Sequence, residues 1–258
     1  MLGSSNPTLT PEVFQANTYG RQLEAGKSMT IQGTINVSLI LAAICAACAI
    51  IGWGLVSNNK ALLLPFCIGS CLGGLAISLL LYFKPNFSPY LAPIYAAGQG
   101  LFIGGVSLLY AEMSKGTKLG GSTGNGIVLQ AGILTFGVLF GMLFLYKANI
   151  IRATGKFVAG VMAATIGIGV FFLGLMLMRL LGMDTSWASS GFIGIGISAV
   201  VVVIASMNLI IDFAVIEEGA ESNQPKYMEW YAAFGLMVTI IWLYLSILRL
   251  LSMLNKRD

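Results

Sequence analysis

Seven apolar stretches, each about as long as a membrane-spanning helix, run through this 258-residue sequence. The hydrocarbon core of a bilayer is about 30 Å thick, and about 20 helical residues cross it. The expected spans are 35–56, 61–83, 91–112, 127–146, 157–181, 191–213 and 230–254. The connections between most of them are short, which leaves no room for a soluble domain. We therefore predict an all-α polytopic membrane protein, folded as a seven-transmembrane-helix bundle.

Charged residues are scarce, and this scarcity excludes several classes of function. Asp, Glu, Lys and Arg make up 9% of the chain, whereas soluble domains carry roughly 25%. The chain has no histidine, which argues against haem ligation, most zinc sites and Ser-His-Asp catalysis. Its basic residues stand singly, so no stripe for nucleic acid exists. We expect no enzyme activity, no cofactor and no nucleic-acid partner.

The first 33 residues differ from the rest of the chain in being polar. They lack the basic and apolar regions of a secretory signal, so we predict a polar tail over 1–33 and a transmembrane domain over 34–258. Lys and Arg are divided equally between the two sides of the predicted bundle. The cluster of Lys147, Arg152 and Lys156 in one short loop favours a cytoplasmic amino terminus.

Glycines spaced four residues apart occur in three of the predicted spans. This spacing places two small residues on one helix face, where the backbones of neighbouring helices can approach closely. A role in flexible gating is the alternative, but we favour tight packing within the monomer because such spacing is common in membrane bundles. The three pairs are Gly69 and Gly73, Gly100 and Gly104, and Gly137 and Gly141.

Asp212 is the ionisable residue that stands out inside a span. It follows the apolar run 200–211, and its short side chain cannot reach far towards the membrane surface. Asn208 lies one helical turn earlier on the same face. We expect Asp212 to be buried in the bundle and to hold its proton more firmly than an exposed aspartate does. The alternative is a carboxylate just past the hydrocarbon edge, close to the acidic residues at 217, 218 and 221.

Several segments of the chain resemble the bacterial branch of the Bax inhibitor-1 superfamily, also called the transmembrane Bax inhibitor motif family. The resemblance spans nearly the whole chain, and its two most specific parts lie in the last two predicted spans. The segments are Ser4-Ser5-Asn6-Pro7, Met29-Thr30-Ile31-Gln32-Gly33-Thr34, Tyr90-Leu91-Ala92-Pro93-Ile94-Tyr95, Asn208-Leu209-Ile210-Ile211-Asp212-Phe213, Tyr227-Met228-Glu229-Trp230-Tyr231-Ala232-Ala233-Phe234-Gly235 and Trp242-Leu243-Tyr244-Leu245.

This resemblance implies a protein of the bacterial inner membrane, with a cytoplasmic amino terminus, that acts as a pH-sensitive calcium leak. In the family, a carboxylate in the sixth helix faces one in the seventh, and their shared proton sets the open or closed state. Asp212 matches the sixth-helix position, but Ser246 stands at the seventh-helix position. Gln99 and Ala214 are likewise neutral where the resemblance implies acids. A serine cannot share a proton with a carboxylate, so the switch is weakened here.

Two hypotheses of function follow from the sequence. The first is a proton-sensitive leak for cations such as calcium, in which Asp212 senses protons together with Asn208, Ser246 and Glu229. Candidates for the pore or gate are Gln99, Glu112 and Arg249. The second is a non-transporting protein that regulates or stabilises partner proteins in the lipid bilayer. We assign no metal ligand, and we expect residues 214–229 to form a long connection between the last two helices.

Overall fold

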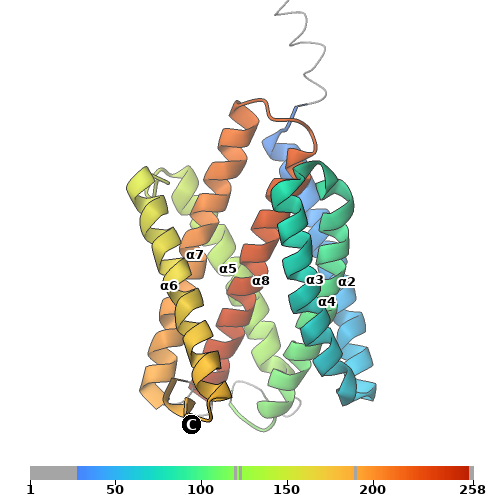
Figure 1. The fold of residues 1–258 in the computed structure, drawn as a ribbon, viewed down its shortest axis with the longest axis vertical. Coiled ribbons are helices and arrows are strands. Elements are labelled where there is room, and N and C mark those ends of the chain that lie inside the picture. Colours follow the sequence, from blue (N-terminus) through green and yellow to red (C-terminus); the bar gives the residue numbers. More distant parts are fainter. Residues whose placement is uncertain (1–27, 119–120, 122–123, 189–190, 256–258) are drawn as a thin grey trace, which may run out of the picture.

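The computed structural model describes residues 28–118, 121, 124–188 and 191–255, so most of the predicted tail lies outside the described residues. Seven helices in the described residues are long and apolar enough to cross a membrane (Figure 1). They are α2 (Ile31–Asn58), α3 (Leu63–Phe83), α4 (Ser88–Met113), α5 (Asn125–Lys147), α6 (Gly155–Leu180), α7 (Gly191–Glu221) and α8 (Met228–Asn255). Short 3-10 helices, η1 (Lys60–Leu62), η2 (Pro85–Phe87) and η3 (Ser186–Ala188), lie between them. The prediction of an all-α seven-helix membrane protein is confirmed.

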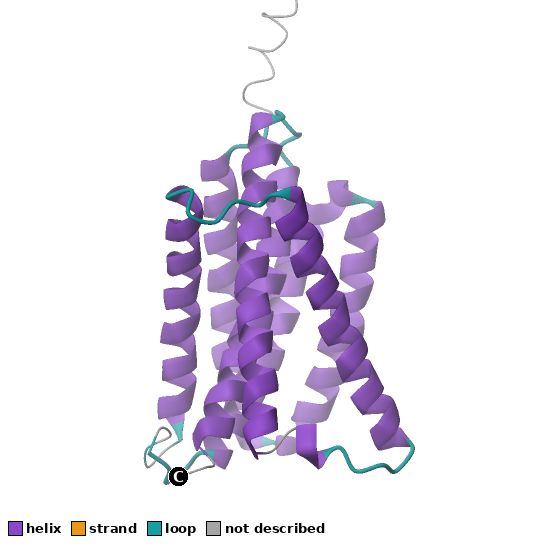
Figure 2. Ribbon diagram, turned by 90° about the vertical axis from the view of Figure 1, so that its left-hand side faces the viewer, coloured by secondary structure: helices purple, strands orange, loops and turns teal. Residues whose placement is uncertain are grey.

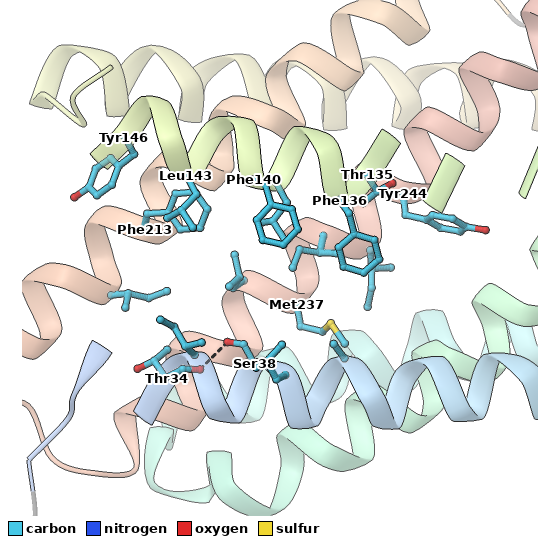
Figure 3. A pocket seen from close by; sticks show the side chains of 18 of the residues that line it. Thr34, Ser38, Thr135, Phe136, Phe140, Leu143, Tyr146, Phe213, Met237 and Tyr244 are labelled. Atoms are coloured by element: carbon cyan, nitrogen blue, oxygen red, sulfur yellow. Dashed lines mark hydrogen bonds between the residues drawn. The ribbon is translucent and has the colours of Figure 1, made fainter. Parts of the chain in front are cut away.

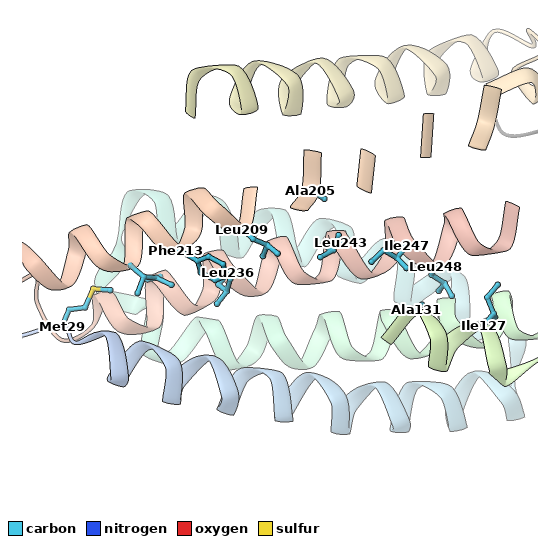
Figure 4. Packing of buried hydrophobic residues seen from close by; sticks show 12 residues of the cluster. Met29, Ile127, Ala131, Ala205, Leu209, Phe213, Leu236, Leu243, Ile247 and Leu248 are labelled. Carbon is cyan, nitrogen blue, oxygen red and sulfur yellow. The ribbon is translucent and has the colours of Figure 1, made fainter. Parts of the chain in front are cut away.

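Helix α8 lies at the centre of the bundle and packs against α2, α4, α5 and α7 (Figure 1). Figure 2 shows the same helices from the side, joined by loops at the two ends of the bundle. One buried apolar cluster joins α8 to α5 and α7, and Figure 4 shows Leu209 and Phe213 of α7 beside Leu236 and Leu243 of α8. A second cluster joins α8 to α2 and α4. By contrast, α6 packs mainly on α7. The last helix therefore connects both halves of the core.

The α7 helix is longer than the sequence analysis predicted. It continues from residue 213 to Glu221, so half of the expected 214–229 connection belongs to α7. Ala214, Val215 and Ile216 extend the apolar run, and the glutamates that follow are good helix formers. The consequence is that Asp212 lies more than two turns inside the helix.

Close glycine packing is confirmed for α4 and wrong for the other two pairs. A Cβ atom on Gly100 would lie 2.4 Å from the backbone oxygen of Cys45, and one on Gly104 would lie 2.0 Å from that of Ala49. The backbones of α4 and α2 therefore meet at these glycines. The pairs on α3 and α5 face open space, with no atom within 4 Å of an added Cβ. The sequence pattern does not distinguish these outward faces from the buried one.

Candidate functional site

The carboxylate of Asp212 has one buried oxygen that lacks a hydrogen-bond partner in the described part of the chain. Among the residues that the structure describes, its Oδ2 is the one buried side-chain oxygen or nitrogen without a hydrogen-bond partner. The flanking residues Leu209, Ile210 and Phe213 are buried and apolar. An ionised carboxylate is unfavourable in such surroundings unless something compensates its charge. A bound proton or a bound cation would provide that compensation.

The hydroxyl of Thr239 in α8 lies beside the Asp212 carboxylate. This hydroxyl also points towards the backbone oxygen of Gly235, at the long distance of 3.4 Å. Because that contact is weak, the hydroxyl can turn and donate to the carboxylate. Thr239 is therefore the polar residue of α8 that faces Asp212, and the sequence analysis did not identify it.

Asp212 also lies deep in the bundle. Thr239 follows Glu229 by ten residues along α8, which corresponds to about 15 Å of helix. Glu229 contacts Thr30 directly before the start of α2, near one end of the bundle. The whole of α8 has 28 residues and is about 42 Å long, so Thr239 lies more than a third of the way along it. This depth argues against a position of Asp212 just past the hydrocarbon edge.

Asn208 connects α7 to α6 and does not donate to Asp212. Its side-chain nitrogen donates to the Thr165 hydroxyl of α6 at 2.9 Å and to the backbone oxygen of Ile204 at 2.9 Å. An amide nitrogen has two hydrogens, and both are used in these contacts. The role of Asn208 in this structure is to hold the loosely packed α6 against the helix that carries Asp212.

Ser246 lies away from Asp212, in the smaller of two cavities, which has a volume of about 280 Å³ and is called the second cavity below. Its hydroxyl donates to the backbone oxygen of Trp242 at 2.8 Å. It follows Thr239 by seven residues, which is about 10 Å along α8. Ser198 of α7 contacts Met253 of α8 at 3.3 Å, which agrees with the same antiparallel register. The structure therefore does not bring together the two positions that the sequence analysis paired.

Arg249 lines the same second cavity as Ser246. Its guanidinium carbon lies 5.1 Å from the centre of the Phe172 ring in α6, a cation–π contact. Within the described ranges, no carboxylate forms an ion pair with Arg249. The cavity thus has a positive charge on its wall and a serine where an acid was expected.

Glu229 is buried at the opposite end of α8, where it binds the start of α2. Its Oε1 accepts hydrogen bonds from the backbone nitrogen of Thr30 at 2.9 Å and from the Thr30 hydroxyl at 2.9 Å. Lys226 also donates to it, at 2.8 Å. The Thr30 hydroxyl in turn accepts from the Gly33 backbone nitrogen and caps α2. Glu229 therefore joins α2 to α8 and is not a partner of Asp212.

Gln99 and Glu112 each attach α4 to the preceding part of the chain. The side-chain nitrogen of Gln99 donates to the backbone oxygen of Ser70 in α3 at 3.3 Å. Glu112 forms an ion pair with Lys60 of η1, with 2.7 Å between the charged atoms. These contacts hold helices together, and neither residue lies in the second cavity beside Arg249.

A sequence profile described as Bax inhibitor 1 like matches residues 6–256, nearly the whole chain. The chain belongs to the Bax inhibitor 1 like family. A comparison with curated proteins finds no match. Membership of this family, together with seven apolar helices, makes the chain an integral membrane protein surrounded by lipid.

As a Bax inhibitor 1 like protein, the chain departs from the paired carboxylates that the sequence resemblance implied. Asp212 faces a threonine, and Ser246 lies beside Arg249. Over the described residues, no three His, Cys, Asp or Glu side chains form a group that could hold a metal ion. The site is thus one buried carboxylate with a neighbouring hydroxyl, which can exchange a proton but offers a divalent cation few ligands.

Proposed function

We propose that this protein is a proton-sensitive cation leak in which Asp212 senses the proton. The observation that supports this best is the buried Oδ2 of Asp212, which has no hydrogen-bond partner among the described residues. Placing a charged side chain at the centre of a bilayer is unfavourable by about 2.5–3.5 kcal/mol, so such residues are rare and usually functional. Family membership adds to this argument, because the resemblance assigns a proton-sensing role to the same position.

The proposed mechanism uses the two charge states of the Asp212 carboxylate. In the ionised state it attracts a cation into the apolar interface between α7 and α8. In the protonated state that attraction is absent, and the Thr239 hydroxyl is its remaining polar neighbour on α8. The leak then depends on pH through a single group. A coupled pair of carboxylates would instead titrate as a unit.

We further propose that monovalent cations pass more readily than calcium. Calcium takes six to eight oxygen ligands, preferably with several carboxylates among them. Asp212 offers one carboxylate, whose Oδ2 is buried, and the buried residues next to it on α7, Leu209, Ile210 and Phe213, are apolar. The positive charge of Arg249 in the second cavity repels a divalent ion more strongly than a monovalent one.

The proposed location is the bacterial inner membrane, with the amino terminus in the cytoplasm. Lys147, Arg152 and Lys156 lie at the end of α5, in the connection that follows it and at the start of α6. Residues of this connection line the same cavity as the first residues of α2, so the basic cluster is at the amino-terminal end of the bundle. Basic residues favour the cytoplasmic side, which supports this orientation.

A second candidate is a non-transporting protein that regulates or stabilises partner membrane proteins. The observation that favours it is the position of Asp212. Its side chain lines neither the second cavity nor the larger cavity beside α2. Ser246 and Arg249 add to this argument because they place a neutral and a positive group where a cation path would need negative charge.

Ion flux in liposomes that contain only this protein distinguishes the two candidates. Purified protein is reconstituted, and potassium flux is followed with a fluorescent indicator between pH 5 and 8. A leak predicts flux above that of empty liposomes, with a rate that changes across this range. Monodisperse, helical protein that gives no flux above empty liposomes at any pH would favour the regulator.

A further inference from the structure

A long groove opens between α2 and α5, with α8 as its floor (Figure 3). Its volume is about 720 Å³, within the range of small-molecule sites in proteins. The groove exists because α2 and α5 both pack on α8 rather than on each other. Figure 3 shows Phe136 and Phe140 of α5 extending towards α2 above Met237 of α8. Phe213 lines the groove, but the side chains of Asp212 and Thr239 do not.

The groove is apolar, elongated and open to the surrounding bilayer. Its lining runs along α2 from Ile31 to Ala49, which corresponds to about 27 Å of helix. One leaflet of the hydrocarbon core is about 15 Å thick, so the groove is long enough for a lipid chain. The side chains of Leu39, Phe136 and Phe140 line it and are more than half exposed. In a membrane, these exposed surfaces face lipid.

The amino-terminal end of the groove is polar and basic. Lys147 and Arg152 line it there, and within the described ranges neither forms an ion pair with a carboxylate. Glu217 also lines this end, but its carboxylate accepts a hydrogen bond from the Tyr146 hydroxyl. The carboxylate keeps its charge in this contact, so two exposed cations and one anion lie where the apolar groove meets the membrane surface, a surplus of one positive charge.

We infer that this groove binds an anionic glycerophospholipid, with an acyl chain between α2 and α5 and the phosphate at Lys147 and Arg152. Basic pockets between transmembrane helices on the cytoplasmic side commonly bind anionic headgroups. A zwitterionic lipid has no net charge to compensate the surplus positive charge, and a free phosphate would leave the apolar groove unfilled. The lipid site shares no polar side chain with the proposed proton sensor, so it stands or falls separately from the leak, but it rests on the orientation proposed above, in which this end of the bundle is cytoplasmic.

The headgroup contact is tested by comparing lipids that differ only in charge. The purified full chain is titrated in detergent with phosphatidylglycerol or phosphatidylcholine of identical acyl chains, and bound lipid is counted by native mass spectrometry. Phosphatidylglycerol should remain bound and raise the melting temperature, whereas phosphatidylcholine should do so at least about tenfold less well. Equal retention of the two lipids would overturn the inference.

Two charge-matched double variants locate the headgroup. Lys147→Gln with Arg152→Gln removes both cations from the groove and should weaken phosphatidylglycerol binding about tenfold or more. Lys84→Gln with Lys156→Gln removes the same charge from the same side of the membrane, but neither residue lines the groove. This control should bind like the wild type. Equal losses in both variants would mean that general surface charge, not this site, retains the lipid.

The acyl chain is tested with two phenylalanines on α5. Phe140 lines the groove and lies seven residues, or about 10 Å, from Lys147, within the thickness of one leaflet. Phe144 is similarly exposed but does not line the groove. Phe140→Ala should therefore weaken phosphatidylglycerol binding, and Phe144→Ala should leave it unchanged. Equal binding by the two variants, or a rise in melting temperature with glycerol 3-phosphate equal to that with the lipid, would refute the proposed chain site.

Discussion

Asp212 in α7 lies opposite Thr239 in α8, two helical turns from Ser246. An acid placed at residue 246 would therefore not face Asp212 in this structure. It would lie one turn before Arg249 on the same helix, at a spacing that favours ion pairs. The group of α8 that faces the Asp212 carboxylate is therefore the Thr239 hydroxyl and not the Ser246 hydroxyl.

The first prediction concerns the position at which a second carboxylate creates a coupled pair. Thr239→Asp should make flux more steeply dependent on pH, because two carboxylates in contact cannot both ionise easily and titrate together. Ser246→Glu should pair with Arg249 and leave the pH profile of flux like that of the wild type. Flux against pH in proteoliposomes measures both. The opposite pattern, with a steeper profile only for Ser246→Glu, would show that the register is wrong.

The second prediction concerns the contact between Glu229 and the start of α2. Glu229→Ala removes a buried acceptor of three hydrogen bonds and should lower the free energy of unfolding by about 2–3 kcal/mol. Gly33→Ala should have a similar effect, because its Cβ would lie 2.0 Å from Oε1 of Glu229.

The double variant tests whether these two effects share one cause. Once Glu229 is alanine, Gly33→Ala has no carboxylate to displace and should have little further effect on stability. Thermal unfolding in detergent provides the measurement. Additive losses in the double variant would show that the two residues act separately.

The third prediction uses glycines whose surroundings differ. Gly104→Ala forces a Cβ against the backbone of α2 and should destabilise the protein by about 1–3 kcal/mol. Gly137→Ala adds a Cβ in open space and should stabilise α5 by up to about 1 kcal/mol, since alanine is the better helix former. Melting temperatures of the two variants should therefore move in opposite directions; a decrease of equal size in both would contradict the packing of α4 on α2.

The fourth prediction is that calcium flux is weak compared with potassium flux. One buried carboxylate binds a divalent cation poorly, and Arg249 adds a repulsive charge. Arg249→Gln should raise the ratio of calcium to potassium flux by lowering that repulsion. Parallel assays with calcium and potassium indicators check this ratio. A calcium flux equal to the potassium flux in the wild type would contradict the expectation that a single carboxylate offers calcium too few ligands.

The sequence was sufficient to predict the seven helices, because each apolar stretch is close to the length that a bilayer requires. It was not sufficient for the pairing of α7 with α8. The predicted span ended at residue 213, although the apolar run continues to Ile216 and the helix continues through the glutamates to Glu221. Extending it would have left a short turn, and a short turn fixes an antiparallel register in which Asp212 meets Thr239.

The role of Glu229 was also beyond the sequence pattern. Thr30 and Glu229 are 199 residues apart, and no local spacing relates them. The capping threonine followed by Gly33 signals the start of α2, but it does not indicate which carboxylate binds there. The groove between α2 and α5 depends in the same way on which helices do not pack together.

The pH profile of potassium flux in proteoliposomes, measured for the wild type and for Asp212→Asn, tests the central claim most directly. Asparagine keeps the size of the side chain but carries no titratable proton. The account predicts a wild-type flux that changes between pH 5 and 8 and a variant flux that is constant over the same range. A variant that keeps the wild-type pH profile would contradict Asp212 as the proton-sensing residue.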